Sequence, residues 1–173
     1  MNPADELLDV VDINDRVLSQ MRRADIHARG LMHRAVHVLV FNSDGDLFLQ
    51  KRSMSKDENP GLWDSSAAGH VDAGEDYRHC AQRELGEELG ISEVAGLKFL
   101  FKLEACADTG NEHSEIYQLV YDGELALQQS EIDEGQWISP QRLKQWLACD
   151  DGRVTATLAL IWQAYCESSV KPD

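Results

Sequence analysis

The sequence predicts an α+β fold in which helices cover the faces of one mixed β-sheet. Segments with strong β propensity alternate along the chain with segments of helical patterning, as expected for a sheet packed between helices. The length of 173 residues suits one domain with a sizeable core, and 43% of the residues are hydrophobic. We therefore expect a single domain over residues 1–173, with residues 1–30 as an N-terminal strand and extension and residues 31–168 as the core.

The N-terminal extension combines a strand with a polar segment. Residues 7–13, LLDVVDI, predict a short strand, and the dipeptide Asn14-Asp15 predicts the turn after it. Residues 16–29 are polar and weakly helical at their beginning, and Gly30 ends them. This extension precedes the main run of strands.

A hairpin begins the core. Residues 33–41, HRAVHVLVF, are strongly β-forming, and NSDGD at 42–46 is a turn signal. Residues 47–51, LFLQK, predict the returning strand. A polar loop at 53–61 follows, and residues 63–71 then lead to a helix.

The second half of the chain mixes helices and strands. A helix is predicted from about Asp76 to Leu89, with Ala73-Gly74 as the turn before it and Gly90 as a left-handed cap after it. The later elements, in order, are strands at 97–105 and 115–121 around a loop at 106–114, a short strand at 136–138, and helices at 140–147 and 155–166.

The helix predicted at 76–89 carries a dense cluster of charge. Arg83, Glu84, Glu87 and Glu88 lie within two turns, and at about 3.6 residues per turn the three glutamates share one face. Neighbouring carboxylates repel one another and destabilise an isolated helix. A bound cation offsets that repulsion, and oxygen ligands suit Mg²⁺ or Mn²⁺, which also bind phosphate oxygens. The alternative is a solvated acidic face, which is common on surface helices.

The residues around this cluster favour the metal site over that alternative. Residues 69–91, GHVDAGEDYRHCAQRELGEELGI, resemble the Nudix box, Gly-x5-Glu-x7-Arg-Glu-U-x-Glu-Glu-x-Gly-U, in which U is a bulky aliphatic residue. Every specified position of the box is filled. The matching residues are Gly69, Glu75, Arg83, Glu84, Leu85, Glu87, Glu88, Gly90 and Ile91.

The resemblance implies both a fold and a chemistry. The fold is the Nudix fold, an α/β/α sandwich with a mixed central sheet, in which the box forms a loop–helix–loop. The chemistry is metal-dependent hydrolysis of a diphosphate linkage, in a nucleoside diphosphate joined to another group, with Mg²⁺ or Mn²⁺ as the cofactor. The expected metal ligands are Glu84, Glu87, Glu88 and the carbonyl of Gly69, and Glu84 and Glu87 are also candidate catalytic groups.

Other box residues are expected to support its geometry. Glu75 and Arg83 lie on either side of the helix start, so they can pair and fix the loop against the helix. Gly74 and Gly90 permit turns that a side chain would obstruct. These four residues are therefore assigned to box support.

The composition narrows the partners and the compartment. The formal net charge of −15 argues against a nucleic-acid backbone as the main partner. Four cysteines without CxxC spacing indicate a reduced compartment. The acidic N-terminus lacks a signal pattern, and no apolar run approaches the roughly 20 residues that span a membrane. We expect a cytoplasmic protein with a small-molecule diphosphate substrate and no membrane partner, and family habit leaves a homodimer open.

Residues 31–76 extend the resemblance to the isopentenyl-diphosphate isomerase branch of the superfamily. The shared features are a His-Arg-Ala strand start, an LFLQKRS strand, a PGLW turn and a histidine just before the box. Such isomerases hold a metal with three histidines and two glutamates and use a catalytic cysteine. His33 and His70 match two of these ligands, Glu115 matches a glutamate, and His113 replaces the other glutamate.

The departures from that branch favour a hydrolase. Ala68 stands where the isomerases have their cysteine, and alanine cannot transfer a proton. His27 lies one place from the expected third histidine, and the box carboxylates are complete here. Glu115 is also a candidate base or ligand of a hydrolase. An isomerase-like enzyme and a non-catalytic domain that senses a phosphorylated ligand are the alternatives.

Several residues outside the box have two interpretations. Lys51 and Arg52 can contact phosphate, or they form an ordinary basic strand end. The histidines His33, His70 and His113 either bind substrate or a second metal, or they belong to the edge of the core. The tryptophans expected in the core or an interface are Trp63, Trp137, Trp146 and Trp162.

Overall fold

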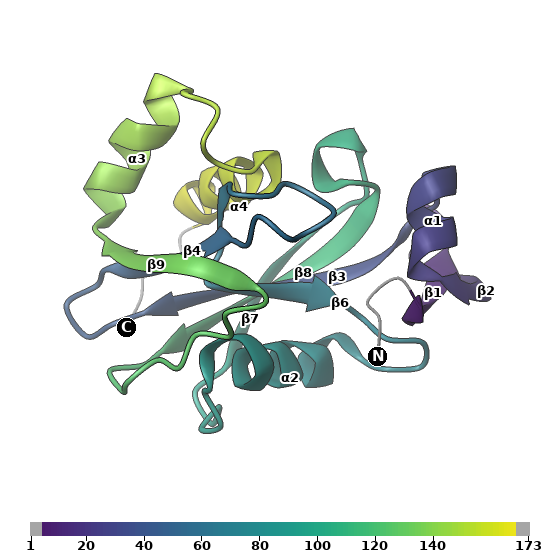
Figure 1. Cartoon of the computed structure of the whole chain (residues 1–173), viewed down its shortest axis with the longest axis horizontal. Helices are drawn as coiled ribbons and strands as arrows, with labels where there is room; N and C mark the ends of the chain where they lie inside the picture. Colours follow the sequence, from purple (N-terminus) through teal and green to yellow (C-terminus); the bar gives the residue numbers. More distant parts are fainter. Residues whose placement is uncertain (1–4, 169–173) are drawn as a thin grey trace.

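The structure, a computed structural model, describes residues 5–168. It contains a seven-stranded mixed sheet with helices on both faces and a separate two-stranded ribbon near the N-terminus (Figure 1). The strands of the main sheet are β3 (His33–Phe41), β4 (Leu47–Arg52), β5 (Trp63–Asp64), β6 (Ala67–His70), β7 (Lys98–Leu103), β8 (Glu112–Val120) and β9 (Ile132–Ile138). The remaining elements are β1 (Leu7–Val11), β2 (Val17–Arg22), α1 (Arg23–Arg29), α2 (Tyr77–Leu89), the 3-10 turn η2 (Ala107–Thr109), α3 (Pro140–Cys149) and α4 (Ala156–Glu167). This arrangement confirms the predicted α+β sandwich.

The order of the strands leaves a gap beside the central strand of the sheet. The order is β5-β4-β3-β8-β7, with β6 paired to β3 and β9 paired to β4. β3 and β8 run parallel, whereas β3 pairs with β4 and β6 in antiparallel fashion. β3 and β4 pair only at Phe41 and Leu47, and β6 lies along the earlier part of β3. The sheet is therefore split between β4 and β6.

Alternating side chains of β3 divide the core between the two faces of the sheet. Val36, Val38 and Val40 belong to the apolar cluster that contains α2. Leu39 and Phe41 belong to the cluster that contains α4. Figure 1 shows α2 on one side of the sheet and α3 and α4 on the other. The earlier odd-numbered residues of β3 include two histidines, so this strand also places polar side chains on the α4 side.

The box helix α2 has the predicted boundaries. The Asp76 carboxylate caps its first turn by accepting the His79 N–H at 2.9 Å. Gly90 follows the helix with a φ of 70°, and its N–H donates to the Gly86 carbonyl at 3.1 Å. Gly74 has a φ of 80° in the turn before the helix. Both glycines occupy left-handed conformations, as the sequence predicts.

The N-terminal extension departs from its prediction. Residues 17–22 form β2, antiparallel to β1, and the helix α1 takes only residues 23–29. The prediction of one polar, weakly helical segment at 16–29 is therefore wrong for its first half. The Asp12 carboxylate accepts two amide N–H groups of the turn, which closes the ribbon and brings β2 onto β1. Gly30 ends α1 with a φ of 58°, as expected.

Several other boundaries move because long-range pairing extends a strand beyond its local propensity. β8 begins at Glu112 rather than at residue 115, because it pairs in parallel with the start of β3. β9 begins at Ile132 rather than at residue 136, because it pairs along β4. The predicted loop at 106–114 is consequently shorter and contains η2.

The tryptophans behave differently from one another. Trp63 and Trp162 are buried in the core on the α4 side, as expected, and Trp146 packs partly against them. Trp137 is exposed on β9 beside Phe48, so of its two expected places, the core and an interface, the core is excluded. Within the described residues, no helix combines the length and apolar character needed to cross a membrane.

Candidate active site

A cavity of about 870 Å³ lies on the α4 side of the split sheet and reaches the box through the split. Its floor includes Ala35 and His37 of β3 and Ala68 and His70 of β6. Its charged lining includes the box glutamates (Glu84, Glu87, Glu88), a set of cations (Arg23, Arg52, Lys56), and Glu112 with His70. Further acidic residues, among them Glu58, Asp64 and Glu131, lie around these groups. The cavity therefore brings acidic, basic and imidazole groups together.

The box glutamates reach this cavity unequally. Glu84 and Glu88 are buried, at 8% and 5% exposure, whereas the Glu87 side chain is 62% exposed at the rim. Glu88 Oε2 accepts hydrogen bonds from Gln50 Nε2 at 2.9 Å and from the Ala68 N–H at 3.0 Å. The carboxylate is thus fixed between β4 and β6. The predicted common face is present, but its members differ in burial.

Burial and mutual repulsion act on the two inner carboxylates. Burial, followed by the charge of Glu88, raises the pKa of Glu84. Burial also raises the pKa of Glu88 above its ordinary value, against the hydrogen bonds from Ala68 and Gln50. Two buried carboxylates without a bound cation hold protons that exposed carboxylates would release. A divalent cation between them would favour their ionised forms.

Arg83 joins the box loop to the helix. Its Nε and one terminal nitrogen donate to the two Glu75 oxygens at 3.1 and 2.9 Å, and its other terminal nitrogen donates to Glu84 Oε1 at 2.6 Å. The same guanidinium donates to the His70 carbonyl at 3.1 Å. Although burial acts in the opposite direction, the hydrogen bonds from Arg83 lower the pKa of Glu75. The predicted Glu75–Arg83 pair is present.

Gly69 is needed where β6 crosses the Glu84 side chain. A Cβ atom at this position would lie 2.0 Å from Glu84 Oε1, a distance shorter than any tolerated contact. The absence of a side chain lets the buried carboxylate pass directly beneath the strand backbone. Gly69 lines the same cavity as the box glutamates.

A second group of candidate metal ligands lies where His70 and Glu112 line the cavity. The rings of His27, His33 and His70 are mutually 5.0 to 5.1 Å apart, and one ligand nitrogen from each falls within 4.8 Å of the others. Glu112 Oε1 lies 3.0 Å from His70 Nε2 and 3.4 Å from His33 Nε2. The Nε2 atom of His27 is buried without a hydrogen-bond partner in the described part of the chain, whereas the buried Nε2 atom of His33 faces Glu112. A cation would satisfy such nitrogens.

The protonation of this group is set by burial and by Glu112. Burial lowers the pKa of His70 to about 4, so its ring is neutral, which is the form that binds metals. Burial acts to raise the pKa of Glu112, but hydrogen bonds with His33 and His70 outweigh it and leave that pKa well below its usual range. Glu112 is a charged carboxylate beside neutral or partly protonated imidazoles.

The structure corrects part of the predicted second site. His33 and His70 belong to it, and His27 of α1 joins them despite its one-residue offset from the expected position. The glutamate is Glu112 rather than Glu115, because β8 places Glu112 directly beside His33 in the parallel register. The pairing of two segments far apart in the sequence decides this position, and only a register prediction would have found it.

Glu115, His113 and Lys51 lie outside the cavity. Glu115 is on the α2 side of the sheet and accepts a hydrogen bond from the Tyr117 hydroxyl at 2.6 Å. His113 is fully buried, and its Nε2 lies 3.0 Å from the Asp12 carbonyl, so it ties the N-terminal ribbon to β8. Lys51 Nζ lies 3.5 Å from Glu134 on β9. The structure places none of the three among the residues that line the cavity with the box glutamates.

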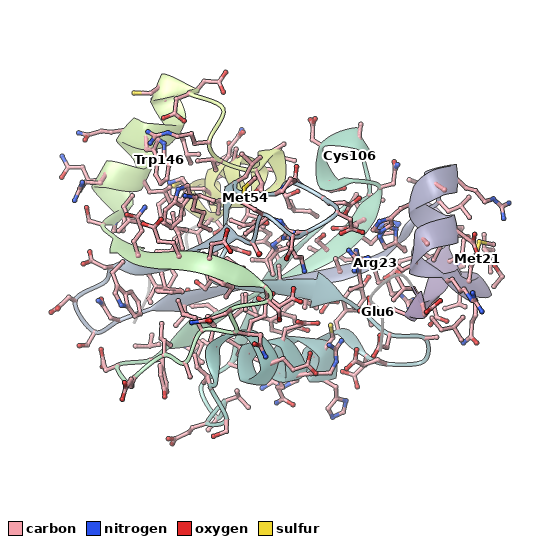
Figure 2. The ribbon with its side chains drawn as sticks, viewed as in Figure 1. Glu6, Met21, Arg23, Met54, Cys106 and Trp146 are labelled. Carbon is pink, nitrogen blue, oxygen red and sulfur yellow. The ribbon has the colours of Figure 1, made fainter. Side chains whose placement is uncertain are left out.

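The cations of the cavity include two that the sequence analysis missed, Arg23 and Lys56. Arg23 begins α1 and contacts Asp57 at 2.9 Å and Glu6 at 3.6 Å. Figure 2 shows Arg23 and Glu6 close together between the N-terminal ribbon and the sheet. Lys56 pairs with Glu131. Sequence patterns do not point to Arg23 or Lys56 as cavity residues, because α1 and the loop at 53–61 approach the cavity only in the folded chain.

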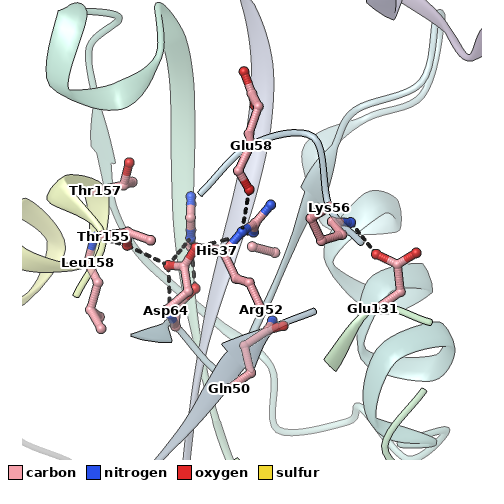
Figure 3. Close-up of polar contacts among 12 residues, drawn as sticks. His37, Gln50, Arg52, Lys56, Glu58, Asp64, Glu131, Thr155, Thr157 and Leu158 are labelled. Atoms are coloured by element: carbon pink, nitrogen blue, oxygen red, sulfur yellow. Dashed lines mark hydrogen bonds and ion pairs between the residues drawn. The ribbon is translucent and has the colours of Figure 1, made fainter. Parts of the chain in front are cut away.

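Arg52, which the sequence analysis did identify, is held at the end of β4. Its Nε donates to the Glu58 carbonyl at 3.1 Å, and a terminal nitrogen lies 3.4 Å from Asp64 Oδ2 (Figure 3). Glu58 itself lies 3.3 Å from His27 Nδ1. The loop at 53–61 is thus tied to α1 and to β4 around the cavity. This loop brings acidic side chains close to the cations.

Comparisons with known proteins agree with this geometry. The family description NUDIX domain matches residues 31–158. A Pseudomonas aeruginosa protein named "Uncharacterized Nudix hydrolase PA4841" is 41% identical over 140 residues, which cover 79% of this chain and 80% of that protein. An isopentenyl-diphosphate Delta-isomerase of Serratia proteamaculans is 34% identical over 142 residues, which cover 80% and 79% of the two chains. The crystal structure of DR0079 from Deinococcus radiodurans has a TM-score of 0.82 at 29% identity, covering 92% of this chain and 98% of that one.

Proposed function

Since the chain belongs to the Nudix hydrolase family and is a pyrophosphohydrolase, we propose that it uses a divalent metal ion to cleave a diphosphate linkage. The substrate class that we propose is a nucleoside diphosphate joined to another group. The observation that carries this proposal is the pair of buried carboxylates, Glu84 and Glu88, that face a cavity also lined by cations. Such a cavity suits an anion that arrives with a metal ion.

The donor set of the box fits Mg²⁺ or Mn²⁺. Glu84 and Glu88 offer carboxylate oxygens whose charge is unfavourable without a cation, and Glu87 and the Gly69 carbonyl offer further oxygens nearby. The ion, when bound, supplies the Lewis acidity and charge neutralisation that hydrolysis of a diphosphate requires. The box residues hold and orient these oxygens, and Arg83 keeps Glu84 in place.

The cations would hold the diphosphate itself. The guanidinium groups of Arg23 and Arg52 suit bidentate contacts with phosphate oxygens, and Lys56 adds a point charge. Together they offset the repulsion between an anionic substrate and a protein with a net charge of −15. Their present acidic partners must then give way to the substrate.

We also propose that His27, His33, His70 and Glu112 hold a second metal ion. Three imidazole nitrogens with one carboxylate suit a transition metal such as Zn²⁺ or Mn²⁺ better than Mg²⁺. The buried, unpartnered Nε2 atom of His27 supports this assignment. An isomerase-like activity has a weaker basis, because Ala68 offers no group that can transfer a proton beside this site.

A hydrolysis screen with Mg²⁺ or Mn²⁺ tests the main proposal. The panel contains ADP-ribose, diadenosine tetraphosphate, nucleoside triphosphates and dimethylallyl diphosphate. We expect Glu88→Gln to lower kcat/KM on every active substrate by at least ~10²-fold, the scale of one acid–base or metal-charge contribution. The exposed Glu124→Gln change is the matched control and should leave the rate unchanged. Equal rates for wild type and Glu88→Gln would show that the box does not carry the reaction.

A further inference from the structure

His37 is a buried imidazole in the cavity that neither metal group uses. It lies on β3, is 4% exposed, and belongs to the floor of the cavity. Its partner across the sheet is Ala68 of β6, whose N–H is bonded to Glu88. The ring therefore lies one strand away from the inner box carboxylate. The small side chains of Ala68 and Ala35 leave room beside it.

The orientation of the His37 ring is fixed by its Nδ1 atom. Nδ1 lies 2.7 Å from Ser65 Oγ and 3.9 Å from Asp64 Oδ1. The Ser65 hydroxyl donates to the Ala67 carbonyl at 3.4 Å, so it is left to accept from the histidine. The tautomer with its hydrogen on Nδ1 satisfies this contact and leaves the Nε2 lone pair free.

Asp64 holds this arrangement in place. Its Oδ1 accepts the Ser65 N–H at 2.8 Å and the Thr155 hydroxyl at 3.1 Å, and its Oδ2 faces Arg52 (Figure 3). The carboxylate is 3% exposed and has several partners, so it is a rigid support. The imidazole cannot turn without losing its contacts with Ser65 and Asp64.

The Nε2 atom of His37 is left for a ligand. This nitrogen has no hydrogen-bond partner among the described residues. It is also not among the fully buried polar atoms that lack a partner, so it faces the cavity. A preoriented acceptor at the floor favours a ligand that offers a hydroxyl or N–H there. A ligand with an apolar group in this place would leave the nitrogen desolvated and unpaired, which costs affinity.

We infer that His37 is a specificity residue that accepts a hydrogen bond from the group attached to the diphosphate. That group is a hydroxyl-bearing sugar or nucleoside rather than a prenyl chain. This inference rests on the proposed function and adds to it the recognition of the non-phosphate part of the substrate. The cations and the box metal would hold the diphosphate, and His37 would accept a hydrogen bond from the group attached to it.

Calorimetry with two non-hydrolysable probes and Mg²⁺ tests the inference. Adenosine 5′-(α,β-methylene)diphosphate carries a nucleoside on a diphosphate analogue, and methylenediphosphonate carries none. We expect His37→Leu to weaken binding of the nucleoside probe by about 10-fold or more, the scale of one hydrogen bond left unmade, and to leave methylenediphosphonate within about twofold. His37→Asn, whose amide oxygen can accept, should retain part of the affinity. Lys56→Gln is the matched control and should weaken both probes.

The outcomes separate this inference from the proposed function. If wild type binds both probes and His37→Leu weakens both equally or neither, His37 does not read the substituent, and the assignment is overturned. The same holds if wild type binds the nucleoside probe no more tightly than methylenediphosphonate. If wild type binds neither probe, the proposed function fails and this inference fails with it.

Discussion

The two ends of the cavity hold buried carboxylates in opposite electrostatic conditions. At the box, burial and the neighbouring carboxylate raise the pKa of Glu84. At the histidine group, burial of Glu112 is outweighed by two imidazoles, and its pKa falls. Burial is similar at both ends, so the neighbours decide the charge. The box carboxylates need an added cation to ionise fully, whereas the imidazoles of the histidine group already stabilise the charge of Glu112.

The largest effect expected from this comparison is on Glu112. Glu112→Gln should lower the free energy of unfolding of the metal-free protein by about 3 kcal/mol, because it removes one partner of a buried ionic group. Denaturant unfolding with EDTA present measures this change. Glu124→Gln, on the surface, is the control. If the free energy of unfolding changes no more than in the control, the contacts between Glu112 and its imidazoles do not stabilise the folded protein.

The pH dependence of stability should distinguish the box. The folded pKa values of Glu84 and Glu88 lie above their ordinary value of 4.5, so their contribution is present at low pH and is lost as pH rises through the folded values. The metal-free protein should thus lose about 1 kcal/mol of unfolding free energy for each unit of pH between about 6.5, where the imidazoles of the unfolded chain no longer gain protons, and about 8, the folded pKa of Glu84. Above that pH the slope should vanish. Unfolding curves at several pH values measure the slope, and saturating Mg²⁺ should flatten it. If saturating Mg²⁺ leaves the slope unchanged, the pH dependence of stability does not arise from the box glutamates.

The smallest expected effect is on Glu84, and it has the opposite sign to that on Glu112. At about pH 9, above its folded pKa of about 8, Glu84 carries a buried charge beside Glu88, and Glu84→Gln removes that charge, so the metal-free protein should become more stable by about 1 kcal/mol. The stabilisation of wild type by Mg²⁺ should be lost at the same time. Thermal unfolding with and without Mg²⁺ measures both. If the two Gln variants shift stability in the same direction, the contrast between the ends of the cavity is wrong.

The sequence predicts the box better than the histidine group for a physical reason. Helix α2 is a local structure, so the Asp76 cap, Gly90 and the Glu75–Arg83 pair follow from short spacings along the chain. The histidine group depends on contacts between distant segments. The parallel register of β3 with β8 places Glu112 in it and moves Glu115 to the other face, and no local pattern encodes that register.

The same reasoning explains the cations and the ribbon. Arg52 ends a strand that is predictable from its own residues, whereas Arg23 reaches the cavity only because β2 and α1 fold back beside the sheet. The sequence patterns around Val17–Arg22 are too weak to specify a strand without β1 as its partner. The missing information was tertiary in each case.

A phosphate that binds in the cavity would replace carboxylates of the loop at 53–61 at their present partners. Asp57 already occupies Arg23, and Glu58 lies against His27, so an incoming phosphate must displace an internal competitor before it gains its own contacts. A ligand with one phosphate gains few contacts for that displacement, whereas a diphosphate with a metal ion gains many. The loop would thereby favour a ligand of high charge, because only such a ligand would replace the contacts that Asp57 and Glu58 make with α1.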